Sequence, residues 1–220
     1  PYFVLARFHK WDDILALKEP DAGPITTATR HYVRGLALAA TGKPDEADTE
    51  LSSLSAIVAA LSPATPFGQN SALSVLGIAR DVLTAKIALA RGQTDTGIAA
   101  LQKAVAAQDL QYYDEPANFY YPTRETLGAA LLKAGRVAKI VCSFPKTSGS
   151  TVFEELYRAG RIELELVPQG TLAERMRAAG AGIGAFFTPT GAGTMLADGK
   201  ETRILDGREQ VLEYPIHADV

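Results

Sequence analysis

The residues best suited to bind a negatively charged ligand lie in the second half of this 220-residue chain. Gly170 permits a tight turn into a helix expected to begin near Thr171, whose free amides would favour an anion. Thr190 and Thr194 add hydroxyl groups further on. Glycines on both sides of the triplet "AFF" let the backbone approach a ligand or a partner closely; these are Gly180, Gly182, Gly191 and Gly193. The pattern predicts a binding loop, although Gly180 also fits a plain helix C-cap and glycine-rich loops occur at subunit interfaces.

The sequence contains no pattern typical of a metal site, a disulfide, a nucleotide-binding loop or a serine nucleophile. His9, His31 and His217 are scattered without ligand spacing, so we expect no metal site. Cys142 is the only cysteine, which excludes an internal disulfide, and we expect it to be a buried strand residue. "GAGIGA" fails the dinucleotide spacing G-x-G-x-x-G because Gly184 comes one place early. The chain also contains no Walker loop, no Gly-x-Ser-x-Gly elbow and no Cys-x-x-Cys.

Three longer motifs resemble the α-type chain of the two-subunit, family I CoA-transferases. They are "PQGTLAER" at 168–175, "GAGIGAFFTPTGAGT" at 180–194 and "DGREQVLEYPIHAD" at 206–219, and the resemblance runs from Lys139 to Val220. "GIGAFF" and "LEYPIHAD" are most similar to the 3-oxoadipate CoA-transferases. Acetoacetate-using members more often have proline at the position of Gly184.

The resemblance implies a ping-pong reaction in which CoA passes from succinyl-CoA to a 3-oxo acid, 3-oxoadipate, through a glutamyl-CoA thioester. The family's nucleophilic glutamate lies on the β-type subunit in a Ser-Glu-Asn-Gly stretch. This chain has no such stretch, so we expect no catalytic residue on it, and Glu154, Glu155 and Glu174 are not assigned that role. A coenzyme A thioester enters as substrate, and no permanently bound cofactor is expected.

Carried over residue by residue, the resemblance places Gln169 near the substrate carboxylate. A side-chain amide donates to a carboxylate without adding charge. The predicted set of substrate- and CoA-binding residues is Gln169, Gly170, Gly180, Gly182, Thr190, Gly191 and Gly193.

The elements that must position these residues have α/β character. "KIVCSF" indicates a strand, and "STVFEELYRAG" a helix with a capping box at Thr151 and Glu154 and a C-cap at Gly160. "RIELELV" alternates like a strand with one wet face, its apolar face carrying Ile162, Leu164 and Leu166.

A second capped helix and a hairpin complete this region. "GTLAERMRAAG" repeats the capping pattern with Thr171, Glu174 and Gly180. "AFF" is a buried strand candidate, and "TRILDGREQVLEY" predicts a hairpin that turns at Asp206–Gly207. The resemblance implies a Rossmann-like sheet. The family's α-type chain normally opens with a strand and a Gly-Gly-Phe-type loop, and both are missing here. Activity is therefore improbable without a β-type partner and that missing half.

The first 138 residues indicate helical hairpins, each with a small residue on one helix and a turn that contains glycine. "LARFHKWDDILAL" resembles the second helix of an earlier hairpin. Stacked hairpins of this kind resemble a tetratricopeptide repeat (TPR) array; a generic helical bundle is the alternative. The small residues are Gly35, Ala85 and Gly128, the turn glycines are Gly42, Gly92 and Gly135, and Ala47 and Gly97 lie on the second helices.

The third hairpin breaks where the α/β pattern begins. Its second helix should have a small residue at the position of Ile140, which lies inside a strand-like segment. We therefore predict α + α/β architecture: an all-α TPR-like domain over 1–138, then a partial CoA-transferase domain over 139–220. Two alternatives stay open: a non-catalytic interaction scaffold with a degenerate CoA-transferase remnant, and an artificially joined chain.

The overall composition limits the kinds of partner that we expect for this chain. A net charge of -3 gives no electrostatic reason to expect nucleic acid, and no apolar run reaches the length of a membrane span. We expect a cytoplasmic protein whose partner is a β-type subunit, with a protein or peptide partner for the helical array. The aromatic segment "LQYYDEPANFYYPTRE" either packs against the helices, which we favour, or forms a recognition surface.

Overall fold

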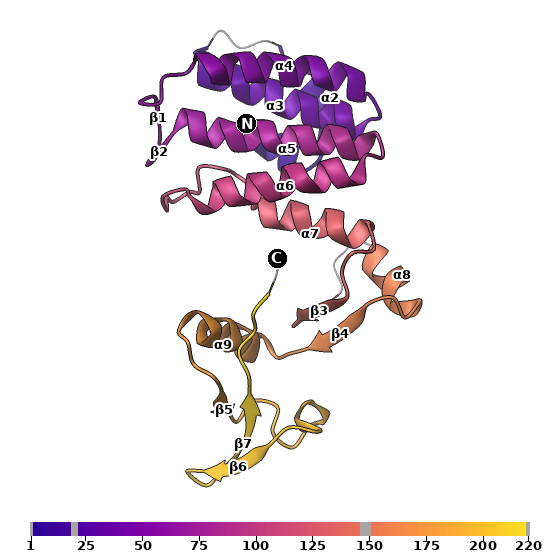
Figure 1. Cartoon of the computed structure of the whole chain (residues 1–220), viewed down its shortest axis with the longest axis vertical. Coiled ribbons are helices and arrows are strands. Elements are labelled where there is room, and N and C mark those ends of the chain that lie inside the picture. The colour runs from indigo at the N-terminus through magenta and orange to yellow at the C-terminus, as the bar shows by residue number, and fades with distance from the viewer. Residues whose placement is uncertain (1, 19–21, 146–150, 219–220) are drawn as a thin grey trace. The chain divides into compact units, whose positions relative to one another are not determined.

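The computed structural model describes residues 2–18, 22–145 and 151–218, and it combines helices with small sheets (Figure 1). The chain divides into two compact units, Pro1–Ala134 and Gly135–Val220, here called the helical unit and the C-terminal unit. This division falls four residues before the predicted domain boundary. The assignment of each half to a domain family stays a prediction at this point.

The helical unit consists of helices that pack side by side in chain order (Figure 1). The two long hairpins, α3 with α4 and α5 with α6, pack closely against each other, and α7 packs on α6. The helices are α1 (Tyr2–Arg7), α2 (Trp11–Ala16), α3 (Pro24–Ala40), α4 (Pro44–Ala60), α5 (Ala72–Ala90), α6 (Thr94–Asp109) and α7 (Thr123–Lys133).

The two hairpin turns have the same construction. Gly42 and Gly92 adopt φ of 78° and 74°, the left-handed conformation that glycine adopts without a Cβ penalty. The next residue then donates its backbone N–H back into the preceding helix: Lys43 to Leu38 O and Gln93 to Ala88 O, each at 2.9 Å. The predicted turn glycines therefore end α3 and α5.

Glycine also permits close helix packing at two of the predicted positions. A Cβ atom on Gly97 of α6 would lie 2.6 Å from Leu89 Cγ of α5, inside the same hairpin. On Gly35 of α3 it would lie 2.6 Å from Leu83 Cδ2 of α5, in the next hairpin. Gly35 therefore brings two hairpins together rather than closing its own.

Two predictions for the helical unit need correction. "LARFHKWDDILAL" is not one helix: α1 ends at Arg7 and α2 begins at Trp11, because His9 between them has φ of 53°. The segment 61–71 contains a short hairpin that the sequence did not predict, β1 (Pro66–Phe67) paired with β2 (Asn70–Ser71). The TPR assignment stays a prediction.

The aromatic segment before α7 divides into a packed and an exposed part. Phe119 is 5% exposed, and Tyr120 stacks on Phe3 at 4.5 Å between ring centroids. Tyr112 and Tyr113 remain 77% and 81% exposed. The favoured prediction, packing against the helices, therefore holds only for the second half of the segment.

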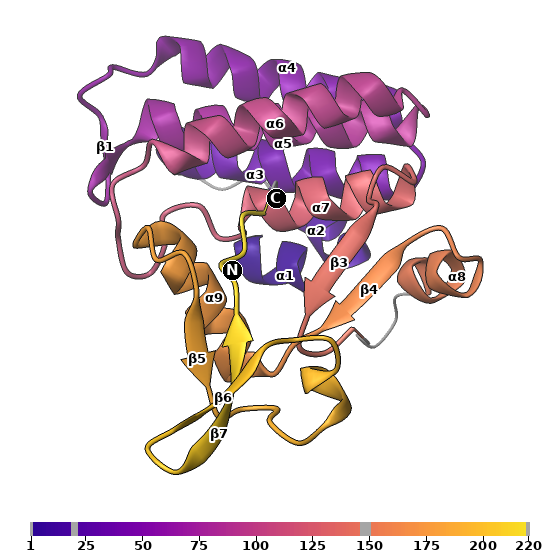
Figure 2. The same cartoon turned by 60° about the horizontal axis from the view of Figure 1, so that its bottom comes forward.

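The C-terminal unit contains two separate groups of strands (Figure 2). β3 (Lys139–Cys142) and β4 (Glu163–Leu166) pair in parallel and are connected through α8 (Val152–Arg158). After α9 (Gln169–Gly180), a three-stranded antiparallel sheet has the order β5-β7-β6. Its elements are β5 (Phe186–Thr188), β6 (Thr202–Leu205) and β7 (Arg208–Glu213), with the 3-10 turn η1 (Met195–Ala197) between β5 and β6.

The predicted strands all form, and the hairpin turns at Asp206–Gly207 with φ of 50° and 73°. The strand predicted to be buried, β5, is only half-buried. Cys142 lies on a strand as expected but is only half-buried. The apolar face of β4 is incomplete, because Leu166 is 47% exposed. The end of the third motif, Asp219, lies outside the described residues.

The helix caps differ from the predicted capping boxes. Thr151 makes no capping hydrogen bond with its side chain, whereas Gly160 ends α8 at φ of 65° as expected. Helix α9 begins at Gln169, so Thr171 lies inside its first turn rather than at the N-cap. Gly180 is the last residue of α9, and the left-handed glycine after it is Gly182, at φ of 69°.

Candidate functional site

The predicted site begins at the carboxyl ends of the two parallel strands. Ser143 directly follows β3, and Gln169 opens α9 shortly after β4 ends. The carboxyl ends of parallel strands meet at one edge of a sheet, where open α/β folds bind ligands. There the Ser143 hydroxyl donates a hydrogen bond to Gln169 Oε1. This bond orients the exposed Gln169 side chain and leaves its amide N–H groups for a ligand.

The N-terminus of α9 adds backbone donors to this edge. The first amides of a helix have no partner inside the helix, and Gln169, Gly170 and Thr171 contribute them here. Gly170 is exposed and has nothing within 4 Å of the position a Cβ would take. Its backbone is therefore open to a ligand. With the helix dipole, these amides make the edge suitable for a carboxylate or a phosphate.

The remaining predicted residues lie on other elements of the C-terminal unit. Gly180 and Gly182 lie at the opposite end of α9, about 16 Å from Gln169 at a rise of 1.5 Å per residue. Thr190, Gly191 and Gly193 lie in the loop after β5. A compact ligand cannot contact both ends of α9, whereas an extended ligand spans that length.

The glycine loop after β5 is held by its own hydrogen bonds. Gly191 and Gly193 adopt φ of 85° and 70°, so both positions require glycine conformations. Thr194 donates its hydroxyl to Gly191 O at 2.7 Å and accepts from Leu196 N at 3.2 Å. Both threonines are exposed, but the Thr194 hydroxyl is engaged in shaping the loop.

An ion network that the sequence did not predict connects the two groups of strands. Arg175 of α9 pairs with Glu165 of β4, Nη1 to Oε1 at 2.6 Å, and donates from Nε to Tyr214 O at 2.7 Å. Its Nη1 also lies 3.8 Å from Glu213 Oε2 of β7. Lys139 of β3 approaches Glu165 at 2.7 Å. Arg175, the last residue of "PQGTLAER", therefore fixes α9 against both β4 and β7.

The two carboxylates of this network, Glu165 and Glu213, are engaged in ion pairs. Glu213 is only 5% exposed and pairs with Lys200 at 2.6 Å. Burial alone would raise the pKa of Glu165, but hydrogen bonds from Lys139 and Arg175 lower it below its usual value. Each carboxylate is held between two cations, and both serve to position α9.

Glu174 and Glu154, two of the glutamates that are not assigned a catalytic role, each pair with an arginine of their own helix. A hydrogen bond from Arg177 lowers the pKa of Glu174. Glu154 pairs with Arg158 at 3.0 Å on the same helix. Within residues 2–18, 22–145 and 151–218 no group of three potential metal-binding side chains occurs, and no helix is long and apolar enough to cross a membrane.

Comparison with known proteins shows what the C-terminal part of the chain is similar to. Residues 125–220 match the model of the Coenzyme A transferase family. This part of the chain is therefore similar to the coenzyme A transferases. The match begins within α7, earlier than the predicted start at residue 139, and covers less than half of the chain.

Three relatives illustrate this similarity, and each is named as a subunit of a CoA-transferase. Over 91 residues the chain is 72% identical to the A subunit of the 3-oxoadipate CoA-transferase of Pseudomonas putida, which is 41% of this chain and 39% of that relative. It is 63% identical to the protein of the same name from Acinetobacter baylyi, with 41% and 40% covered. The A subunit of a succinyl-CoA:3-ketoacid coenzyme A transferase from Xanthomonas campestris is 53% identical over 90 residues, with 41% and 36% covered. The chain thus spans about two fifths of the length of these relatives.

Proposed function

We propose that the C-terminal unit acts as part of the α-type subunit of a 3-oxoadipate CoA-transferase. The observation that supports this most is the 72% identity to a subunit of such an enzyme, together with the free amides of α9 beside Gln169. CoA would pass from succinyl-CoA to a glutamate of a β-type subunit, releasing succinate. It would then pass from that glutamyl thioester to the 3-oxo acid, regenerating the glutamate.

In this proposal the chain binds and orients, and the partner supplies the nucleophile. The Gln169 amide donates to a carboxylate of the acyl group, and the first turn of α9 faces the same charge. Ser143 is a positioning residue that holds the Gln169 side chain. The other predicted contacts, Gly180, Gly182, Thr190, Gly191 and Gly193, serve the remainder of an extended CoA thioester.

The decisive test combines the full chain with a β-type subunit, succinyl-CoA and 3-oxoadipate. We expect a glutamyl-CoA thioester on the β-type subunit, detected by mass spectrometry, and formation of the 3-oxoacyl-CoA. If no thioester forms at any ratio of the two proteins, the chain is not a catalytic α-type subunit. The non-catalytic scaffold would then be the better description.

Gln169→Ala tests the site within this assay. Loss of a hydrogen bond to a charged group should lower kcat/KM by about 10- to 100-fold. Ser143→Ala should raise KM more than it lowers kcat, because Gln169 remains but is less well held. Gln102→Ala, on the exposed surface of α6, is the matched control and should leave turnover unchanged. Equal rates for Gln169→Ala and Gln102→Ala would remove Gln169 from the site.

A further inference from the structure

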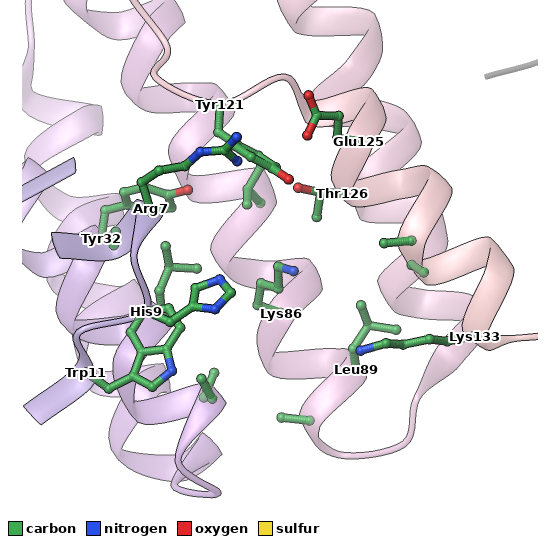
Figure 3. Close-up of a pocket in the computed structure, with 18 of the residues that line it drawn as sticks. Arg7, His9, Trp11, Tyr32, Lys86, Leu89, Tyr121, Glu125, Thr126 and Lys133 are labelled. Carbon is green, nitrogen blue, oxygen red and sulfur yellow. The ribbon is translucent and has the colours of Figure 1, made fainter. Parts of the chain in front are cut away.

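The helical unit contains a cavity that the CoA-transferase function does not use. Its volume is about 680 Å³, within the range of sites for small molecules. Its lining residues come from α1, α2, α3, α5, the start of α6, and the segment and helix around α7, all inside the helical unit. Figure 3 shows Lys86 projecting from α5 into this space, with Arg7 and Lys133 on either side of it.

The charge of the lining is unbalanced. Arg7, Lys86 and Lys133 line the cavity, and Glu125 is its only carboxylate. Glu125 is engaged by a hydrogen bond with the Tyr121 side chain. In the part of the chain that the structure describes, no carboxylate lies within salt-bridge distance of Lys86 or Lys133. The cavity thus has a positive charge that the protein itself does not neutralise.

The position of Lys86 is unfavourable for its charged form. It is the only charged residue in "VLTAKIALA" of α5, and burial, with a smaller effect of repulsion from Lys133, lowers its pKa. Lys86 is half-buried, and an ammonium that is partly withdrawn from water without a partner opposes folding; this cost is reduced when an anion binds. Such a residue is easier to explain as part of a binding site than as part of a core.

Aromatic side chains form the walls around these cations. The His9 ring stacks on Trp11 at 5.0 Å between centroids, and the left-handed backbone of His9 places this pair beside the cavity. The Arg7 guanidinium lies 4.4 Å from the centroid of the Tyr121 ring, which holds it in place. Apolar ring faces favour a ligand with a carbon body over a bare inorganic anion.

We propose that this cavity binds a small organic dicarboxylate, with one carboxylate between Lys86 and Lys133 and the other near Arg7. The charge of the lining and a volume suited to a small molecule support this ligand class. The proposal does not depend on the function of the C-terminal unit.

Trp11 provides a direct measurement, because it is the only tryptophan of the chain and lines the cavity. We would titrate the full chain with adipate and follow tryptophan fluorescence. A saturable change is expected with adipate, and a change at least about tenfold weaker with hexanoate, which lacks the second carboxylate. The absence of saturation, or binding of inorganic phosphate or a triglutamate peptide in preference to adipate, would overturn the proposal.

Lys86→Met and Lys43→Met form a matched pair for this titration. Lys86→Met should weaken adipate binding by at least about tenfold, because it removes the half-buried cation that projects into the cavity. It should also raise the urea midpoint of the unliganded helical unit, because burial and repulsion no longer oppose folding. Lys43 is exposed at the start of α4, and Lys43→Met should change neither binding nor the midpoint. Unaltered adipate binding by Lys86→Met would contradict the proposal whatever its stability.

Discussion

The helical unit and the C-terminal unit are stabilised in different ways. The helical unit has fully buried large side chains on successive helices, among them Tyr32, Leu54, Leu83 and Leu101. In the C-terminal unit, the buried apolar side chains on the described residues are Ile162, Val167, Ala178 and Val211. Its elements are connected instead by the ion network around Arg175.

The C-terminal unit also leaves large apolar side chains in contact with solvent. Met176 and Tyr214 are 52% and 60% exposed, and Ile204 is 69% exposed. Exposed apolar side chains of this kind are available for contact with another protein. The relatives are each named as one lettered subunit of their enzyme, which implies a hetero-oligomer with a second subunit. The helical unit therefore has an extended apolar core of its own, whereas the C-terminal unit is held mainly by polar contacts.

Leu83→Ala should produce the largest loss of stability, confined to the helical unit. Leu83 is fully buried and its side chain covers Gly35, so truncation leaves a cavity between α3 and α5. The expected cost is about 3 kcal/mol of unfolding free energy. Urea unfolding followed by Trp11 fluorescence reports this unit alone. Leu110→Ala, at a residue that is 83% exposed, should change the free energy by less than about 0.5 kcal/mol. Equal effects of the two changes would mean that this core does not stabilise the unit.

Arg175→Met should destabilise the C-terminal unit and leave the Trp11 transition unchanged. Arg175 is 11% exposed, and its loss removes the pairing to Glu165 and the hydrogen bond to Tyr214 O. Lys139 and Lys200 remain to neutralise the two carboxylates, so the expected cost is about 2 kcal/mol, below that of a fully unpaired buried charge. Amide hydrogen exchange in β4 and β7 measures this loss of stability. Arg208→Met, at an exposed strand end, is the control, and faster exchange in both variants would argue against a specific role of Arg175.

Sequence patterns predicted the local features of both units. The turns at Gly42, Gly92 and Asp206–Gly207 depend on a few adjacent residues, and each is found. Apolar periodicity also depends on residues close together in the chain, and it located the main helices and β3 to β7. Where a pattern was ambiguous, tertiary context decided: Thr171 has the spacing of a capping residue, but α9 starts two residues earlier, directly after Pro168.

The site residues that the sequence did not reveal depend on contacts between distant positions. Arg175 meets Glu213 across 38 positions, and no spacing rule relates the two. Ser143 reaches Gln169 in the same way, across 26 positions. Lys86 did leave a signal, a single charge in an otherwise apolar helix, but its meaning depends on Lys133 and Arg7 lining the same cavity.

Acid should produce the smallest of these effects, a loss of stability of the C-terminal unit that follows protonation of Glu165. Its pKa is lower in the folded protein than its ordinary value of 4.5, so its pairing stabilises the fold above that value. This contribution is lost as the pH falls from about 4.5 through the lowered folded pKa, because the unfolded chain then binds the proton more readily. Amide protection factors in β3 and β4, which correct for the pH dependence of intrinsic exchange, should therefore fall below about pH 4.5. Glu165→Gln, which cannot titrate, should be less stable at pH 7, and its stability should change less over the same pH interval. An identical acid profile in the parent chain and Glu165→Gln would show that the network contributes nothing to the stability of the C-terminal unit.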